Sequence, residues 1–316
     1  MRAQTSSRRQ RGAALLTAMI IVTLVATLAA AMVWQQWRAV QVEAAERARA
    51  QAAWILSGAL DFAKLILKND KKPYTALTEP WATPLAESRI STFLAIDKSN
   101  AEDGPEAFLS GNIDDAQARY NLNNLVTDAG KPIPAEVAIL GQLCMAVGIE
   151  TGIAGRIASG LGDSLNPTNA AGHLPPRSVA QLTWLGLDQA SVEALKPYVV
   201  LLKRGALVNV NTASKEVLMA VAGLDPGTAE NLLQVRQRTP FKTQDEFTKL
   251  IPEAGRSQAQ SQLVFRSNFF EVRGRLRLAD RVLVERSLLE RVSSAGSIEF
   301  KVLQTERVAS LEQVGG

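Results

Sequence analysis

The sequence contains very few of the residues on which metal sites and histidine-dependent active sites are built. Its 316 residues include one histidine, His173, and one cysteine, Cys144. A lone cysteine cannot close an internal disulfide, and its apolar neighbours predict a buried thiol. Any histidine-dependent triad would have to use His173, which lies in the loop-like stretch AAGHLPP. Glycine-rich nucleotide-binding loops are also missing, so we expect a protein that is not an enzyme and needs no cofactor.

The chain also lacks a basic excess beyond its first twelve residues. Four arginines in that stretch account for the whole formal net charge of +4, and the 31 remaining basic residues balance the 31 acidic ones. The body of the chain therefore has no overall attraction for nucleic acid or acidic lipid, although a local basic patch stays possible.

Charge is absent altogether from Gly12 to Trp37. As a helix, residues 13–34 would extend about 33 Å, which is enough to cross a bilayer and too long for the apolar core of a secretory signal. The arginines before this run favour a cytoplasmic N-terminus, with the rest of the chain on the far side. We therefore expect a transmembrane helix at 13–37.

Helix-forming sequence continues after this segment. Residues 38–70 contain no proline and one glycine, and apolar residues recur at steps of three and four. This spacing predicts an amphipathic continuation of the same helix, broken only near 69–73.

The region from 71 to 126 combines turn-rich sequence with short apolar runs. We expect irregular structure first, with one strand near 90–96. A hairpin should follow, with strands at 107–113 and 118–124. The adjacent acids Asp114 and Asp115 at its turn are expected to be solvated.

Residues 266–316 alternate apolar residues with arginine and glutamate. This period of two predicts antiparallel strands, with the charges on an outward, solvated face rather than in a ligand site.

Between these strand regions, residues 127–265 have helical character and contain an internal repeat. The stretch that begins at Ser178, SVAQLTWLGLDQASVEALKPYV, aligns with the one from Ser214, SKEVLMAVAGLDPGTAENLLQV, with one residue of slippage. Each copy predicts a helix, a tight glycine-containing turn and a second helix, with serine or threonine as caps. A further short helix is expected after Pro240.

The repeat resembles helix-hairpin-helix units, which raises the alternative of a membrane-anchored DNA-uptake protein. Units that bind DNA offer free backbone N–H groups of the turn to a phosphate. In this chain the turns carry an acid, with Gly186 and Asp188 in the first copy and Gly223, Asp225 and Gly227 in the second. Because a carboxylate repels phosphate, we expect both hairpins to be scaffold and nucleic-acid binding to be absent.

The N-terminal segment resembles the leader of type IV prepilins, in which a short basic stretch and a glycine precede an apolar helix. The resemblance implies that a dedicated prepilin peptidase cleaves between Gly12 and Ala13 and that the mature chain is methylated. The fifth mature residue of that class is usually glutamate, and here it is Thr17. A carboxylate at membrane depth costs about 2.5–3.5 kcal/mol and is kept where something pairs with it. A subunit without it suits a filament tip, although Thr17 is also compatible with a plain anchor whose leader stays attached.

The chain resembles the general secretion pathway protein K family from Arg11 to about Val292. The resemblance rests on the combination of this leader, a hairpin ending RYNLNNL, the motifs VNVNTAS and PFKTQDEF, and closing strands. The resemblance implies an α+β pilin fold, in which a long N-terminal transmembrane helix packs on a small antiparallel sheet and a large all-α domain is inserted. It also implies a minor pseudopilin of the type II secretion system. Such a subunit sits at the pseudopilus tip and primes assembly for export of folded proteins across the outer membrane.

The implied partners are the minor pseudopilins of the I, J and H types, the major pseudopilin, the prepilin peptidase and the inner-membrane secretion platform. The implied location is the inner membrane, with residues 1–12 cytoplasmic and the body periplasmic.

In relatives the insertion often carries an acidic loop that can bind calcium. The matching segment here offers only Asp163, Asn166 and Asn169 as oxygen ligands. Because calcium usually takes six to eight oxygens, including several carboxylates, we do not expect a calcium site.

Overall fold

A computed structural model describes residues 7–90, 107–165, 174–278, 281–294 and 297–309. The chain divides into two compact units, Met1–Ser57 and Gly58–Gly316. The first is helical, and the second holds a five-stranded sheet and a set of shorter helices.

Helix α1 runs without a break from Ser7 to Asn69, so the charge-free segment and its predicted continuation are one helix. The helix ends where the Asp70 carboxylate accepts a hydrogen bond from the backbone N–H of Lys72, at 3.2 Å. Pro73 reinforces this end because a proline disfavours helical conformation in the residue before it. The break expected at 69–73 is confirmed.

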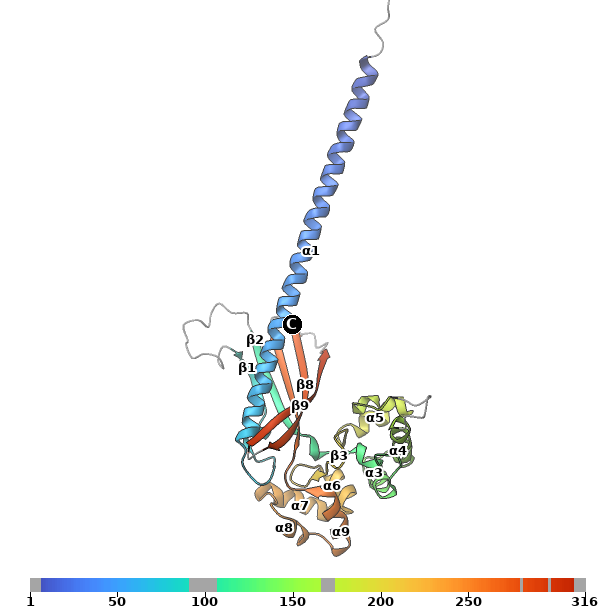
Figure 1. Ribbon diagram of the computed structural model, residues 1–316, viewed down its shortest axis with the longest axis vertical. Coiled ribbons are helices and arrows are strands. Elements are labelled where there is room, and N and C mark those ends of the chain that lie inside the picture. Colours follow the sequence, from blue (N-terminus) through green and yellow to red (C-terminus); the bar gives the residue numbers. More distant parts are fainter. Residues whose placement is uncertain (1–6, 91–106, 166–173, 279–280, 295–296, 310–316) are drawn as a thin grey trace, which may run out of the picture. The chain divides into compact units, whose positions relative to one another are not determined.

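The sheet is antiparallel throughout, in the order β1–β2–β7–β8–β9 (Figure 1). Its strands are Leu85–Arg89, Ala107–Asp115, Phe269–Leu278, Arg281–Ser294 and Ser297–Ala309. The predicted alternation is confirmed in β7, where Val272 and Leu276 are buried and Arg273 between them is exposed.

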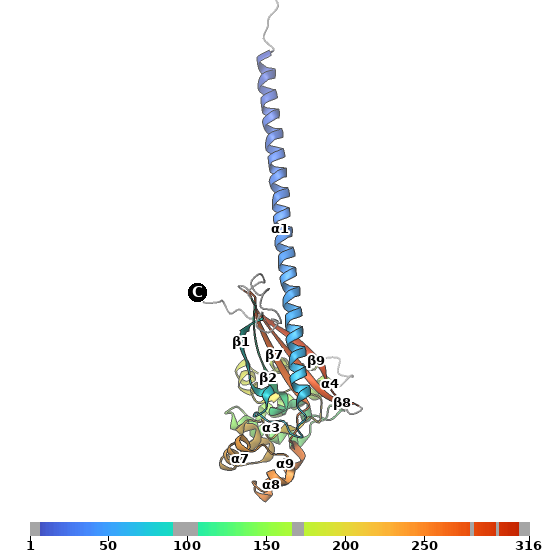
Figure 2. The same cartoon turned by 90° about the vertical axis from the view of Figure 1, so that its left-hand side faces the viewer.

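The last turns of α1 pack on one face of this sheet, and both ribbon views place them there (Figures 1 and 2). Ala63 and Leu67 form a core cluster with Trp81, Phe270 and Leu289. Burying a leucine or phenylalanine side chain contributes about 1.5–3 kcal/mol. The helix and the sheet therefore form the α+β pilin fold that the family resemblance implies.

The prediction of a hairpin is wrong for its second strand. β2 forms as predicted and reaches Asp115, but its long-range partner is β7. Within the predicted second strand, 118–124, only Tyr120–Asn121 (β3) forms a strand, and this segment pairs in parallel with β4, Val199–Val200. The chain turns away because Ala116–Ala118 form a short 3-10 helix that Asp115 caps.

The strand expected near 90–96 lies outside the described residues, apart from Ile90. β1 forms immediately before it, where irregular structure was expected. A short 3-10 helix, Pro80–Ala82, precedes β1 and carries the buried Trp81.

Helices α3 to α9 all lie between β2 and β7 in the sequence and form the inserted domain. They are Pro134–Ala146, Gly152–Leu165, Gln189–Leu195, Lys215–Ala222, Pro226–Arg238, Gln244–Thr248 and Glu253–Gln262. One apolar core joins them, with Leu140, Leu218 and Phe247 fully buried. A parallel pair of two-residue strands, β5 (Val208–Asn209) and β6 (Leu263–Val264), closes the insertion.

The two repeat copies form helix–turn–helix units, but the first helix of the first copy is a 3-10 helix, Val179–Leu185, rather than an α-helix. Its cap is a capping box in which Ser178 and Gln181 exchange hydrogen bonds. In the second copy Ser214 caps α6 by accepting from the backbone N–H of Val217. The predicted serine caps are therefore confirmed in both copies.

Candidate assembly site

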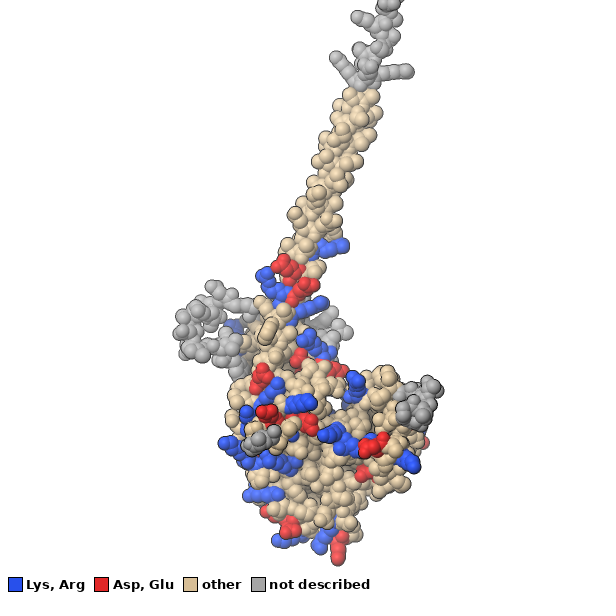
Figure 3. All heavy atoms as spheres, viewed as in Figure 1, with Lys and Arg blue, Asp and Glu red and all other residues tan. Residues whose placement is uncertain are grey.

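The N-terminal part of α1 carries a long, exposed apolar surface. Large apolar side chains from Leu15 to Val42 are more than half exposed. By length and composition the helix from Ala13 onward can cross a membrane, with a mean hydropathy of 2.4 in its most apolar window. Figure 3 shows a long stretch of this helix without charged side chains, and the first charge after Arg11 in the sequence is Arg38. Lipid or other helices have to cover it.

The predicted cleavage residues Gly12 and Ala13 both lie inside α1, and Thr17 follows one turn later. The Thr17 hydroxyl donates to the carbonyl oxygen of Ala13 at 2.6 Å and lies 3.3 Å from that of Ala14. Its polar group is thus satisfied within the helix and brings neither charge nor an unpaired donor into the membrane. Thr23 and Thr27 bond to their own helix in the same way.

The turns of the two repeat copies are closed by their aspartates. Gly186 and Gly223 end the first helices in left-handed conformation, with φ of +81° and +61°. Asp188 and Asp225 then cap the second helices, and Asp225 Oδ1 accepts from the backbone N–H groups of Gly227 and Thr228 at 2.9 and 3.0 Å. Hydrogen bonds from the hydroxyls of Ser191 and Thr228, and after them the backbone N–H bonds, hold the pKa of the Asp188 and Asp225 carboxyls below the ordinary value.

A phosphate would need those same N–H groups at the start of the second helix. In the second copy the Asp225 carboxylate already accepts from them. That the hairpins are scaffold stays a prediction.

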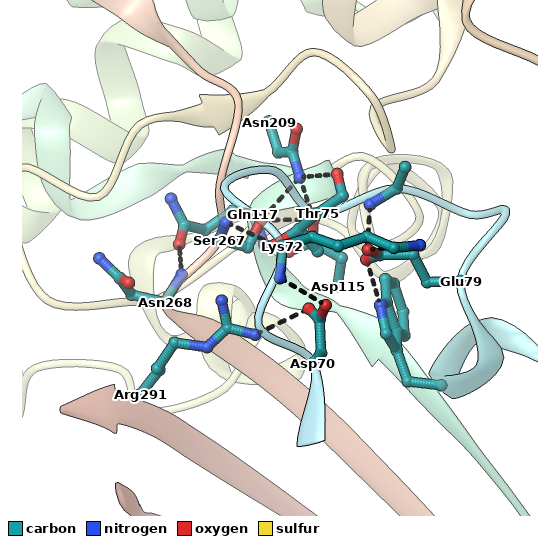
Figure 4. A network of polar contacts seen from close by, with 12 residues as sticks. Asp70, Lys72, Thr75, Glu79, Asp115, Gln117, Asn209, Ser267, Asn268 and Arg291 are labelled. Atoms are coloured by element: carbon teal, nitrogen blue, oxygen red, sulfur yellow. Dashed lines mark hydrogen bonds and ion pairs between the residues drawn. The ribbon is translucent and has the colours of Figure 1, made fainter. Parts of the chain in front are cut away.

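A buried polar cluster lies where the inserted domain meets the sheet (Figure 4). Asp115, at the end of β2, is its centre and is almost fully buried. Its Oδ2 accepts hydrogen bonds from Thr212 Oγ1 and Ser267 Oγ, both at 2.6 Å, and from Asn209 Nδ2 at 2.8 Å. Its Oδ1 accepts from the backbone N–H of Gln117 at 2.8 Å. We call these five residues the Asp115 cluster.

Burial raises the pKa of the Asp115 carboxyl, and hydrogen bonds from Ser267, Thr212 and Asn209 offset part of that rise. The donors come from the 3-10 helix that follows β2, from the insertion and from the segment that returns to β7. The chain passes from the sheet into the insertion after β2 and returns to the sheet before β7. Hydrogen bonds to the Asp115 carboxylate hold both of these connections.

A second buried pair adjoins this cluster in the same view (Figure 4). The Arg291 guanidinium of β8 lies 3.5 Å from Asp70, which follows the end of α1. It also stacks on Phe270 and Phe300, 5.0 and 5.5 Å from their ring centroids. Burial lowers the pKa of Arg291, and the nearby Asp70 carboxylate opposes that shift. The pair ties the end of α1 to the sheet.

The sequence interpretation missed this cluster because it placed Asp115 in a solvated turn. That expectation is wrong for Asp115, whereas Asp114 is exposed. The alternation of side chains along β2 could have predicted the burial of Asp115. Asp115 is in phase with Leu109 and Ile113, on the face of β2 that turns toward α1. The strand simply extends two residues further than its apolar run.

The weak metal and thiol candidates do not form a site among the residues that the structure describes. Asp163 is an exposed residue of α4, while Asn166, Asn169 and His173 lie outside the described residues. No group of three or more metal-ligating side chains occurs within the described part of the chain. Cys144 is buried in α3, and burial raises the pKa of its thiol to about 11, which keeps it protonated and unreactive.

Comparisons with known proteins give the same family along the chain. Two sequence models described as type II secretion system (T2SS), protein K, match residues 118–204 and 208–266. The type II secretion system protein K of Pseudomonas aeruginosa is 30% identical over 312 residues, with 90% of each chain covered. That of Pectobacterium carotovorum subsp. carotovorum is 28% identical over 319 residues, covering 89% of this chain and 92% of the relative.

A solved structure is similar in fold. It is a chain of the GspK–GspI–GspJ complex from the type 2 secretion system of enterotoxigenic Escherichia coli, with a TM-score of 0.61 and 20% identity. The similarity covers 84% of this chain and 99% of that one. With an apolar N-terminal helix, a pilin sheet interrupted by a helical domain, and relatives matched along almost their whole length, this chain belongs to the type II secretion system protein K family.

Proposed function

We propose that this chain is the minor pseudopilin that occupies the tip of the pseudopilus and primes its assembly for the export of folded proteins across the outer membrane. In this proposal the prepilin peptidase removes residues 1–12, and the mature N-terminus is methylated. The retained helix holds the chain in the inner membrane, N-terminus toward the cytoplasm and body in the periplasm, until it joins the filament.

The observation that supports the proposal is that the helix with the exposed apolar surface also carries Thr17 where the class usually has glutamate. The helix needs covering, which neighbouring pseudopilin helices supply in a filament. The Thr17 hydroxyl donates to a carbonyl oxygen of its own helix. Because threonine is uncharged, it offers no negative charge to the amine of a subunit ahead. A subunit that can dock others below it and none above it belongs at the leading end.

The proposed partners are the I-, J- and H-type minor pseudopilins, the major pseudopilin and the secretion platform. A solved structure of similar fold belongs to a GspK–GspI–GspJ complex, which supports the I- and J-type partners. The inserted domain enlarges the proposed periplasmic body of the chain, and a bulky body favours a terminal position in the filament.

Mass spectrometry of the N-terminus tests the first step. A mature chain that starts at Ala13 is expected, and retention of residues 1–12 would contradict the proposal. Replacing Gly12 with leucine should block processing and secretion together, whereas replacement of Gln10 should affect neither. In-cell crosslinks should join this subunit to neighbours on one side only.

A further inference from the structure

The helix of the first unit carries a small aromatic and basic cluster at the end of its apolar run. Trp34 and Trp37 lie with ring centroids 5.5 Å apart, and the Arg38 guanidinium lies over the Trp34 ring at 5.9 Å. Both indoles are more than half exposed, at 57% and 56%. Positions 34, 37 and 38 share one side of the helix, so the three groups form one surface.

The position of this cluster matches a bilayer boundary. Residues 13–33 contain no charged and no aromatic residue. As a helix these 21 residues extend about 31 Å, close to the thickness of a bilayer hydrocarbon core of about 30 Å. The first tryptophan and the first charge after Arg11 therefore arrive together where that core ends.

The chemistry of the cluster fits a lipid headgroup. Tryptophan is favoured at the membrane–water boundary because its ring is apolar and its indole N–H is a donor. A guanidinium can face an aromatic ring and still offer the N–H donors in its own plane to a phosphate, so the contact with Trp34 leaves Arg38 able to bind one. A helix-packing role explains the indoles less well, because two large exposed rings hold a neighbouring helix away.

We propose that Trp34, Trp37 and Arg38 form an interfacial anchor that binds the phosphate of an anionic phospholipid headgroup in the leaflet opposite the leader. This inference rests on the proposed membrane topology. The anchor fixes the depth of α1, so that the Gly12–Ala13 bond lies at the other hydrocarbon boundary, within reach of a membrane-bound peptidase. Release into a filament then requires exchange of the headgroup for protein contacts.

Depth-dependent fluorescence quenching tests the anchor in the full chain reconstituted into vesicles. The difference in emission between the wild type and the Trp34→Leu/Trp37→Leu variant isolates the two indoles, because Trp54, Trp81 and Trp184 remain in both. Lipids brominated near the headgroup should quench this difference about twofold more than lipids brominated at the chain end. Stronger quenching by the deep label, or none by either, would overturn the anchor.

A Leu24→Trp variant separates this failure from failure of the membrane topology. Its added emission should be quenched most by the deep label, since residue 24 lies midway along the apolar run. If it is quenched while the two native indoles are not, only the anchor is wrong. If neither label quenches it, the helix does not span the bilayer, and the topology and the anchor both fail.

The headgroup preference is tested by Arg38→Gln. Headgroup-brominated phosphatidylglycerol should quench the two indoles more than the same fraction of brominated phosphatidylcholine, and Arg38→Gln should remove that difference. Arg47→Gln is the matched control, because Arg47 is already paired with Glu43 at 2.9 Å. Equal quenching by both lipids in the wild type, or an Arg38→Gln variant that keeps the difference, would refute anionic-lipid binding.

Discussion

The side-chain amide of Asn209 donates a hydrogen bond of 2.8 Å to the carboxylate of Asp115, although 94 positions separate them in the sequence. The same nitrogen also lies 3.0 Å from the carbonyl oxygen of Thr75 and 2.8 Å from Ser267 Oγ, so one asparagine joins three distant segments. Asn209 lies in the insertion and Asp115 in the sheet. The insertion is therefore fastened by buried hydrogen bonds as well as by covalent connections at its two ends.

Asp115→Ala should lower the free energy of unfolding by about 3 kcal/mol, because it leaves the buried donors of Thr212, Ser267 and Asn209 without their shared acceptor. Urea unfolding of the full chain in detergent measures the effect. Asp114→Ala is the matched control, since that neighbour is exposed and a surface change costs within about 0.5 kcal/mol. Equal losses for the two variants would mean that the cluster contributes no stability.

The pH dependence of stability distinguishes burial from hydrogen bonding at Asp115. Its pKa is raised from 3.8, mainly by burial, so the folded protein holds this proton more tightly than the unfolded chain does. The resulting stability is fully present below about pH 4 and is lost as the pH rises through the folded pKa. The advantage of the wild type over Asp115→Asn should therefore be larger near pH 4 than at pH 7. An advantage that grows with pH would show that hydrogen bonds outweigh burial.

Sequence patterns predicted elements whose causes are local. The length of α1, the caps at Ser178 and Ser214, and the alternation in β7 follow from neighbouring residues, and the structure confirms them. The pairing of β2 with β7 and the burial of Asp115 were missed because their causes lie far away in the chain. The residues of a strand do not show which other strand will pair with it. An acidic side chain beside a turn is expected to be solvated, because the donors that bury it come from distant parts of the chain.

Two glycine substitutions should shift stability in opposite directions. Gly223 ends α6 with φ of +61°, so alanine there is strained by about 1 kcal/mol. Gly58 lies within α1 with open space around an added Cβ, and alanine there should stabilise the helix by about 0.5–1 kcal/mol. Thermal unfolding of Gly223→Ala and Gly58→Ala gives the signs. A shift in the same direction for both would contradict the backbone argument.

Calcium removal should leave the protein unchanged. Asp163 is the one carboxylate among the three oxygen ligands that the sequence offers, which is too few for a calcium ion. Melting temperatures measured with excess calcium and with a chelator should agree. A drop on chelation, reversed by calcium and abolished in Asp163→Ala, would establish a calcium site.

Thr17 provides the sharpest separation between a tip subunit and an ordinary filament subunit. Thr17→Val should leave membrane insertion unchanged, because the hydroxyl that it removes is bonded only within its own helix. Thr17→Glu adds a carboxylate at a cost of up to about 3 kcal/mol, so less of the chain should insert, as scored by protease protection. The inserted fraction regains a negative charge that can pair with the amine of a subunit ahead, so crosslinks to neighbours should appear on both sides. If Thr17→Glu still crosslinks on one side only, the missing acid does not determine the terminal position, and the bulk of the inserted domain has to account for it.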